Sequence, residues 1–420
     1  MSVTKEPLSE TPPAYAGGVE PPGPPATVRR AEKLPLALRH VLSLEDFEAA
    51  GRRRLPWCLF GFVSGGVETD ASVRANRAAF ADWALRPRML VDTSERNQNA
   101  MLFDRQYASP FGIAPMGATV LSCCDGDLVL ARAAAAANIP FILSGASLIP
   151  LERIVAENPA AWFQAYIPSD RGRIGPLVER VGQAGFETLV VTVDVPVSAN
   201  RENNARNGFT LPMRPSLRLA LDGLAHPEWL FGTALRNLLR NGMPHFENMD
   251  ATRGPPILSP EAARDRGRRD ALCWADIEWI RSFWNGRLVI KGVLTAEDTR
   301  LARQIGLDGV IVSNHGGRQL DFAVASLRAL PEVVAEAGGM TVMLDSGVRR
   351  GTDVLKALAL GAQFVFLGRP FLYAAAVAGE AGVRHAILLL SEEIDRDLAL
   401  LGCPDLAQLG PESLMWVPGR

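Results

Sequence analysis

The sequence predicts an α/β protein, a single (β/α)8 barrel of the TIM type with an N-terminal helical extension and an insert between strand four and strand five. Three observations predict this fold. Eight short apolar runs alternate with amphipathic, Ala- and Leu-rich stretches. The runs are rich in β-branched residues and almost continuously hydrophobic, and polar residues recur where they end. A chain of 420 residues, 48% of them hydrophobic, can bury a core of this size.

The predicted strands are apolar enough to be buried on both faces, as parallel strands are. They lie in the runs FGIAPMG (111–117), FILSG (141–145), WFQAYI (162–167), TLVVTVDV (188–195), LVIKGV (288–293), GVIVSNHG (309–316), MTVMLDSG (340–347) and FVFLGRP (364–370). Stretches between them, such as GDLVLARAAAAAN and RGTDVLKALALGA, have the apolar spacing of helices. A doubly wound open sheet is the alternative, but it favours a glycine fingerprint after the first strand, and this sequence has none there.

The segments that flank the barrel differ in composition. Residues 1–34 are rich in Pro, Gly and charge, which predicts a disordered arm. Ser43, followed by Glu45 and Asp46, predicts a helix start, because a hydroxyl caps the first turn and carboxylates favour it. We therefore expect the barrel to span residues 35–410 and residues 411–420 to form a C-terminal tail.

Residues 205–270, which we call the insert, interrupt the alternation. Their stretch LRLALDGLAHPEWLFGTALRNLLRNGMPHF interleaves Leu, Trp and Phe with three arginines: Arg218, Arg236 and Arg240. A basic amphipathic segment can lie on an anionic membrane surface. The other interpretation is a loop that covers the site as a lid or packs against another subunit.

Composition excludes several classes of protein. The formal net charge of −2 gives no attraction to nucleic acid, and we expect no such partner. Five cysteines without CxxC spacing predict neither a disulfide framework nor a metal site, and favour a reducing compartment. The N-terminus lacks the apolar core of a signal sequence, and no run approaches the roughly 20 apolar residues of a membrane span. We expect a cytoplasmic protein.

The stretch SNHGGRQLD (313–321) concentrates acid-base and anion-binding groups directly after an apolar run. Polar residues end the other predicted strands as well, and barrel enzymes build their sites at these ends. We expect one shared site that contains Ser144, Gln164, Tyr166, Thr192, Asp194, Lys291, His315, Arg318, Asp345 and Arg369.

At these residues the sequence resembles the FMN-dependent α-hydroxy acid oxidase/dehydrogenase family. The resemblance covers about residues 40–410 and includes, in family order, RPRML, IAPMGA, FQAY, TVDVP, IKGVLTAEDTRLA, SNHGGRQLD, DSGVRRGTDVLKALALGA and LGRP. The HPEW and GMP segments, DSG and the ending GCPDL are similar to the membrane-associated, quinone-linked branch typified by (S)-mandelate dehydrogenase and L-lactate dehydrogenase.

The resemblance implies an enzyme that oxidises a 2-hydroxy acid with FMN as its cofactor. His315 corresponds to the family's base and Asp194 to the aspartate that pairs with it. Tyr166 corresponds to the tyrosine that bonds the substrate hydroxyl. Arg201 and Arg318 correspond to two arginines that bind the substrate carboxylate, for which a pair of guanidinium groups is well suited.

The resemblance also implies where FMN binds. Lys291 would lie beside flavin N1 and O2, where a fixed cation raises the flavin potential. Arginine and glycine after strands seven and eight would hold the phosphate, as in other barrels. The implied ring contacts are Ala114, Pro115, Met116, Gly117, Ser144, Gln164, Thr192 and Ser313. The implied contacts of the ribityl-phosphate end are Asp345, Gly347, Arg349, Gly368 and Arg369.

Three positions depart from the pattern of the family's hydroxy acid oxidases. Phe62 replaces a tyrosine that helps to bind the substrate carboxylate, which predicts a loss of about 1–2 kcal/mol of binding. Ala146 replaces a tryptophan of glycolate-type members and opens the pocket for a bulky or aromatic side chain. Gly117 stands where oxidases commonly have alanine, which favours an acceptor other than oxygen.

We therefore expect oxidation of an (S)-2-hydroxy acid to the 2-oxo acid, with electrons passed to an acceptor such as a quinone. The alternatives are an oxidase that releases H2O2, an FMN enzyme acting on a biosynthetic intermediate, and a flavin-binding protein without turnover. The resemblance further implies a homo-oligomer, a tetramer in many members. A peripheral contact of the insert with the inner face of the membrane is a further expectation.

Overall fold

The computed structural model describes residues 34–210, 214, 216–261 and 269–417. Apart from Leu34, the arm predicted for residues 1–34 lies outside the described residues, as do parts of the insert and the last three residues of the chain. From Leu34 onward the chain forms one compact unit.

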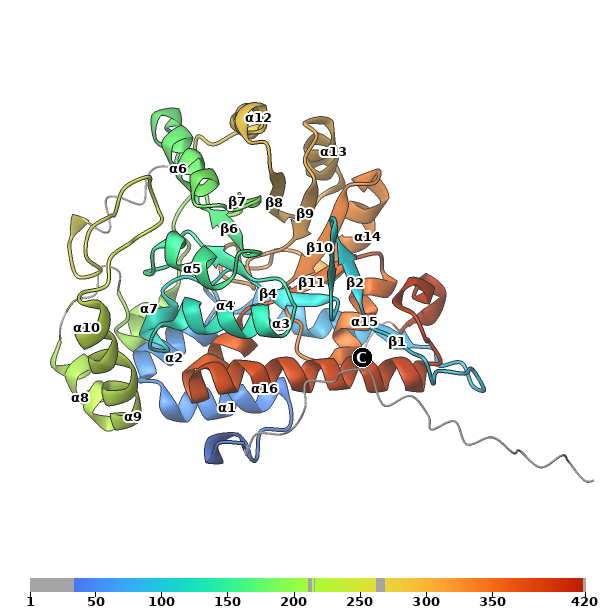
Figure 1. Ribbon diagram of the computed structural model, residues 1–420, viewed down its shortest axis with the longest axis horizontal. Coiled ribbons are helices and arrows are strands. Elements are labelled where there is room, and N and C mark those ends of the chain that lie inside the picture. The colour runs from blue at the N-terminus through green and yellow to red at the C-terminus, as the bar shows by residue number, and fades with distance from the viewer. Residues whose placement is uncertain (1–33, 211–213, 215, 262–268, 418–420) are drawn as a thin grey trace, which may run out of the picture. The chain divides into compact units, whose positions relative to one another are not determined.

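Eight parallel strands form the barrel that the sequence predicts (Figure 1). They are β4 (Phe111–Ile113), β5 (Ile142–Ser144), β6 (Trp162–Ala165), β7 (Thr188–Thr192), β8 (Arg287–Val293), β9 (Gly309–Val312), β10 (Thr341–Asp345) and β11 (Phe364–Leu367). Each strand from β5 onward pairs with the next, and β11 pairs with β4. A parallel bridge between Ile113 and Phe141 completes the ring. The barrel prediction is confirmed, and each apolar run contains its strand.

A helix follows each strand and packs on the outside of the barrel (Figure 1). Only the connection after β7 is long, because the insert precedes its helix. The helices are α4 (Gly126–Ala136), α5 (Leu151–Glu157), α6 (Arg171–Gln183), α12 (Trp274–Phe283), α13 (Ala296–Gln304), α14 (Ser326–Ala337), α15 (Gly351–Ala359) and α16 (Arg369–Leu401).

The N-terminal extension is helical, as predicted. It contains η1 (Leu36–Leu38), α1 (Leu44–Arg54), α2 (Trp57–Ser64), α3 (Ala71–Ala78) and η2 (Ala79–Asp82). The predicted start at Ser43 is confirmed, because the Ser43 N–H donates to the Asp46 carboxylate at 2.9 Å. The predicted tail contains η6 (Pro411–Ser413) and β12 (Leu414–Trp416), which pairs with β1 (Trp83–Leu85).

A hairpin of β2 (Ala100–Leu102) and β3 (Arg105–Tyr107) covers the amino-terminal end of the barrel. Phe103 lies 5.5 Å from Trp162, the first residue of β6, and Tyr107 lies 5.7 Å from Phe364, the first residue of β11, between ring centroids. Leu102 and Tyr107 are buried with the side chains that fill the barrel. This end is therefore closed by apolar packing.

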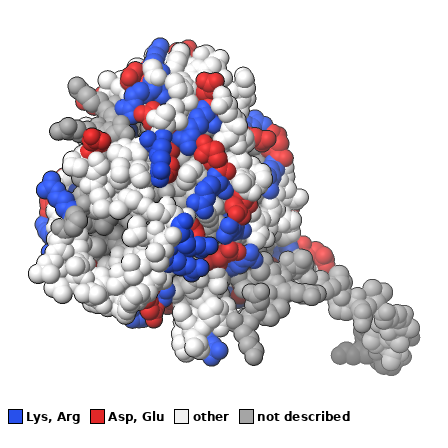
Figure 2. Space-filling view, turned by 60° about the vertical axis from the view of Figure 1, so that its left-hand side comes forward, with Lys and Arg blue, Asp and Glu red and all other residues white. Residues whose placement is uncertain are grey.

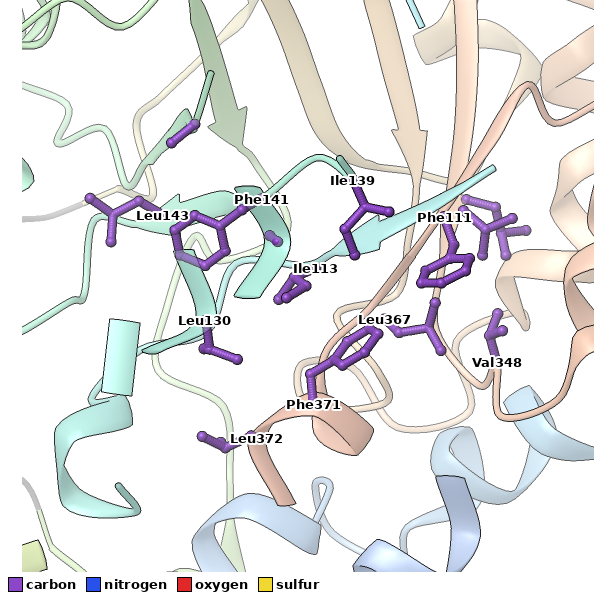
Figure 3. Packing of buried hydrophobic residues seen from close by; sticks show 14 of the residues in the cluster. Phe111, Ile113, Leu130, Ile139, Phe141, Leu143, Val348, Leu367, Phe371 and Leu372 are labelled. Carbon is purple, nitrogen blue, oxygen red and sulfur yellow. The ribbon is translucent and has the colours of Figure 1, made fainter. Parts of the chain in front are cut away.

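The larger part of the core lies between the strands and the surrounding helices. Figure 3 shows one section of it, where Phe111, Ile113 and Phe141 lie above Phe371 at the start of α16. All four side chains are almost completely buried. The start of α16 is thus fixed beneath β4 and β11, and the residues that precede it at the end of β11 are fixed with it.

The insert contains short helices: α8 (Leu217–Ala225), α9 (Pro227–Trp229), the π-helix η4 (Leu230–Leu235) and α10 (Arg236–Asn241). Figure 2 brings the side of the insert forward and shows a broad area without charged side chains low on this face. The large apolar side chains that α8, η4 and α10 expose are Leu217, Leu221, Leu224, Phe231, Leu235, Leu238 and Leu239.

One described helix, α16, is long and apolar enough to cross a membrane by length and composition alone. More than half of its apolar window is buried inside the protein, and its helical geometry breaks at Ala378 and Gly379. The helix packs against α1, α4 and α15. These contacts identify it as a core helix of the barrel unit.

Candidate active site

A cavity of about 550 Å³ opens at the carboxyl-terminal ends of the barrel strands. Its volume is in the range of small-molecule and cofactor sites. Most predicted site residues line it: Phe62, Ala114, Pro115, Met116, Gly117, Ala146, Tyr166, Thr192, Arg201, Lys291, His315, Arg318, Asp345, Gly347, Arg349, Gly368 and Arg369. The other four are hydrogen-bonded to lining residues or to one another: Ser144, Gln164, Asp194 and Ser313.

His315 and Asp194 form a pair across the ends of β9 and β7. The His315 Nδ1–H donates to Asp194 Oδ1 at 2.8 Å. His315 has a φ of +59°, and its N–H donates to the Ser313 hydroxyl at 3.0 Å, so its backbone is held in an unusual turn. Because Nδ1 carries the proton, Nε2 is left as an acceptor, 3.5 Å from the Tyr166 hydroxyl.

The protonation states of this pair suit a base. Burial lowers the pKa of His315 below its usual value, and Asp194 opposes this effect only in part. Burial acts to raise the pKa of Asp194, but His315 and Lys291 outweigh it, and the pKa of Asp194 is lowered. A neutral imidazole beside a carboxylate can take up a proton, and the carboxylate then stabilises the imidazolium.

Lys291 is a buried cation whose partners are fixed. Its Nζ lies 3.0 Å from Asp345 Oδ2 and donates to the Ser313 hydroxyl at 2.8 Å. Burial acts to lower the pKa of Lys291, but Asp345 and Asp194 outweigh it and raise that pKa. The register shift between β8 and β9 occurs at Gly292, directly after Lys291. Asp345, which the resemblance assigns to the ribityl-phosphate end, thus also pairs with this lysine.

Three arginines line the cavity without a carboxylate partner in the described part of the chain. Arg318 and Arg369 both donate to the Val63 and Gly65 carbonyls, at 2.7–3.3 Å. Arg349 donates to the carbonyl of its own neighbour, Val348. Burial, reinforced by the neighbouring guanidinium groups, lowers the pKa of Arg349 to about 10 and the pKa of Arg318 well below its usual range. So many buried cations call for an anion.

Arg201 lies directly before α7 (Glu202–Asn207) and contacts the segment that carries Arg318. Its Nε donates to the Arg318 carbonyl at 3.2 Å and its terminal nitrogen to Gln319 Oε1 at 2.7 Å. The charge of Arg201 contributes to the lowered pKa of Arg318. The predicted pair of arginines therefore meets at one cavity wall.

The residues present fit FMN, a ring with polar edges and a phosphate. Arg349 and Arg369 can receive a phosphate, and Gly347 and Gly368 lie beside them in the lining. The buried polar atoms that lack a hydrogen-bond partner among the described residues include Gln164 Nε2 and Thr192 Oγ1, both from side chains expected to bond the flavin ring. Each requires a hydrogen bond that a flavin ring can supply. Lys291 lies in the same lining and can provide the cation expected near the ring.

Apolar side chains form the rest of the wall. Phe62 stacks on Phe209 with ring centroids 4.2 Å apart, and the Arg318 guanidinium lies 5.2 Å from the Phe62 centroid. A Cβ added to Gly117 would lie 2.9 Å from the Ala146 Cβ. The two small residues therefore face each other and leave this part of the cavity open.

Among the lining residues that were not identified from the sequence are several large side chains of the insert. Phe209, Phe246, Met249 and Arg269 all belong to the insert. Arg269 lies 5.1 Å from the Tyr166 ring centroid. No local pattern marks them, because their place in the site depends on how the insert folds back over the barrel.

Comparisons with known proteins point to one enzyme family. Residues 51–416 match the model of the FMN-dependent dehydrogenase family. The chain is 38% identical to (S)-mandelate dehydrogenase of Pseudomonas putida over 90% of this chain and 94% of that protein. It is 40% identical to an L-lactate dehydrogenase of Pseudomonas aeruginosa over 88% of this chain and 97% of that protein.

The fold agrees as well. A crystal structure described as monotopic membrane protein (S)-mandelate dehydrogenase superposes with a TM-score of 0.85 at 38% identity, covering 90% of this chain and all of that one. A structure of mandelate oxidase superposes with a TM-score of 0.75 at 36% identity, over 90% of this chain and 99% of the other. The chain belongs to the FMN-dependent dehydrogenase family.

Proposed function

We propose that this protein oxidises an (S)-2-hydroxy acid with a bulky or aromatic side chain to the corresponding 2-oxo acid. The observation that carries the proposal is the His315–Asp194 pair, with Nδ1 protonated by its 2.8 Å hydrogen bond and Nε2 left as an acceptor in a cavity lined by arginines. A hydroxy acid requires both functions, a base for its proton and cations for its carboxylate.

Each residue of the site has a separate role in the proposed reaction. Arg201 and Arg318 bind the substrate carboxylate, which holds the carbinol carbon in one orientation. His315 Nε2 takes a proton from the substrate, and Asp194 stabilises the imidazolium that forms. Tyr166 donates a hydrogen bond to the substrate oxygen. FMN, when bound, would accept the two electrons and the other proton that the substrate loses. Lys291 holds a positive charge where the oxidation leaves negative charge.

The size and polarity of the cavity support a large substituent on the substrate. Phe62, Phe209, Phe246 and Met249 supply apolar wall, and Ala146 leaves space opposite Gly117. An aromatic ring gains free energy by leaving water for such a wall. The similarity to (S)-mandelate dehydrogenase and to mandelate oxidase supports the same substrate class.

We extend the proposal to the acceptor and to the place of action. The relative of known structure is described as a monotopic membrane protein, and the insert of this chain exposes leucines beside Arg218, Arg236 and Arg240. An apolar face with basic residues suits an anionic lipid surface. A membrane quinone is then the natural electron acceptor, and the protein acts as a peripheral enzyme on the inner face of the membrane, as a homotetramer.

The test is anaerobic mixing of the purified yellow protein with (S)-mandelate, (R)-mandelate and (S)-lactate while the flavin absorbance is recorded. We expect (S)-mandelate to bleach the flavin fastest and (R)-mandelate to leave it unchanged. Reoxidation by a soluble quinone faster than by air would identify the acceptor class. Bound flavin that no hydroxy acid reduces would refute the proposed substrate class, and rapid reoxidation by air with peroxide release would identify an oxidase.

A further inference from the structure

Helix α2 connects the insert with the arginines of the cavity. The helix has eight residues, Trp57–Ser64, and so spans about 12 Å. Its amino-terminal end lies against α8 of the insert, and its carboxyl-terminal end carries Phe62 and the Val63 carbonyl into the site. Because α2 is a single short helix, a contact that fixes its amino-terminal end also affects the position of its carboxyl-terminal end.

The amino-terminal end of α2 is capped by a residue far away in the sequence. Its own N-cap residue is Pro56, whose side chain has no acceptor. Instead, the Asp222 carboxylate accepts hydrogen bonds from the N–H groups of Trp57 at 3.1 Å and of Cys58 at 3.3 Å. A carboxylate at this end also interacts favourably with the positive end of the helix dipole.

Asp222 is itself fixed within the insert. His226, four residues later at the end of α8, places its Nδ1 3.3 Å from Asp222 Oδ1 and 2.8 Å from the Asp222 carbonyl. The Asp222 side chain is only 11% exposed. The Asp222 carboxylate is thus held where it caps α2, and water has little access to take its place as an acceptor.

The carboxyl-terminal end of α2 holds the cavity arginines. The Val63 and Gly65 carbonyls are the shared acceptors of Arg318 and Arg369, and the face of Phe62 covers Arg318. The negative end of the helix dipole favours these cations.

The same end of α2 contacts α7, the helix that follows Arg201. The Asn203 side chain on α7 donates to the Gly61 carbonyl at 2.7 Å. Gly61 and Gly65 leave room for the side chains of Asn207 and Asn203, which would lie within 3 Å of an added Cβ. Because α7 begins directly after Arg201, α2 contacts the segments that carry both arginines.

We infer that Asp222 is a positioning residue: by capping α2 it sets the place of the substrate-binding arginines and of the phosphate-binding Arg369. The inference rests on the proposed function for the role of Arg318, but its consequence for FMN affinity does not depend on which substrate the enzyme takes.

The test compares three variants of the full-length protein. Asp222→Ala removes the cap, Asp222→Asn keeps an oxygen acceptor, and Glu228→Gln removes only the neighbouring ion pair between the insert and Arg54. For Asp222→Ala we expect KM for (S)-mandelate and the dissociation constant of FMN each to rise about fivefold, the equivalent of a lost helix cap, with kcat changed less than about twofold. Asp222→Asn and Glu228→Gln should stay within about twofold of the native protein.

Unchanged KM and unchanged FMN affinity in a folded Asp222→Ala protein would overturn the inference. So would equal damage by Glu228→Gln, because the insert would then act by its attachment alone. If Asp222→Ala does not fold, Asp222→Leu takes its place, because leucine has a similar shape and also lacks an acceptor, and native constants in that variant would have the same meaning. If no hydroxy acid reduces the flavin, the proposed substrate class fails, whereas the FMN titration still decides the role of Asp222.

Discussion

The two ends of the barrel satisfy their buried groups in opposite ways. At the amino-terminal end, the β2–β3 hairpin closes the barrel with Leu102, Phe103 and Tyr107. At the carboxyl-terminal end, buried guanidinium groups and the orphan atoms of Gln164 and Thr192 surround a cavity. One end is complete by itself and stabilises the fold. The other end is completed by ligands, so substitutions there should affect binding and rate more than stability.

The largest effect should come from His315→Ala at the ligand end. Without the base, the rate of flavin reduction by (S)-mandelate should fall about 10²- to 10⁴-fold. The melting temperature should change little, because the ring lies at the cavity and not in the apolar core. Stopped-flow absorbance and thermal unfolding measure the two quantities. His245→Ala, in the insert and outside the cavity lining, is the control and should keep the native rate.

The closed end should show the reverse behaviour in Leu102→Ala. Leu102 is 2% exposed, and its truncation leaves a cavity among apolar side chains. We expect a loss of about 2–5 kcal/mol of unfolding free energy, measured in denaturant, with KM and kcat of the folded protein unchanged. Met101→Ala, at the neighbouring position of the same hairpin, is 58% exposed and should change stability by less than about 1 kcal/mol. A large loss of activity in folded Leu102→Ala would show that the two ends are coupled.

Arg349 and Arg350 are adjacent in the sequence but differ in their partners, so they allow the ligand-binding end to be compared with the outer surface. Arg349 lines the cavity, whereas Arg350 pairs with Glu45 and Glu393 on the outside. Arg349→Met should weaken FMN binding about 10- to 100-fold, the effect of losing a charge-assisted hydrogen bond to phosphate. Arg350→Met should leave FMN affinity unchanged and lower only stability. Titration of the apoprotein with FMN, followed by flavin fluorescence, separates them.

The same contrast explains how much the sequence predicts. The strands are recognisable because continuous apolar runs have few other uses in a soluble domain, and the SNHGGRQLD stretch identifies His315 and Arg318 because its residue types are specific. Contacts across the fold are different. Two such contacts join residues that are distant in the sequence: the Asp222 cap of α2 and the Lys291–Asp345 pair. Phe246 likewise reaches the cavity from a distant segment. Such pairings depend on how the insert and the strand ends meet, and no local pattern records them.

The smallest expected effect is a shift along the pH axis. Burial lowers the pKa of His315, and the base must be neutral to act. The value of kcat/KM should therefore be constant above the pKa of His315 and fall as the pH drops through it. This limb should lie below pH of about 6.5, the ordinary value for histidine.

The variant Asp194→Asn tests whether the acid limb of kcat/KM reports the protonation of His315. Asp194 is the group that raises the pKa of His315 against the effect of burial, so its removal should move the acid limb of kcat/KM to lower pH. The rate on the plateau should fall as well, because the imidazolium loses its partner. A limb that stays in place in Asp194→Asn would mean that another group titrates, and the base would then have to be sought among the other side chains that line the cavity.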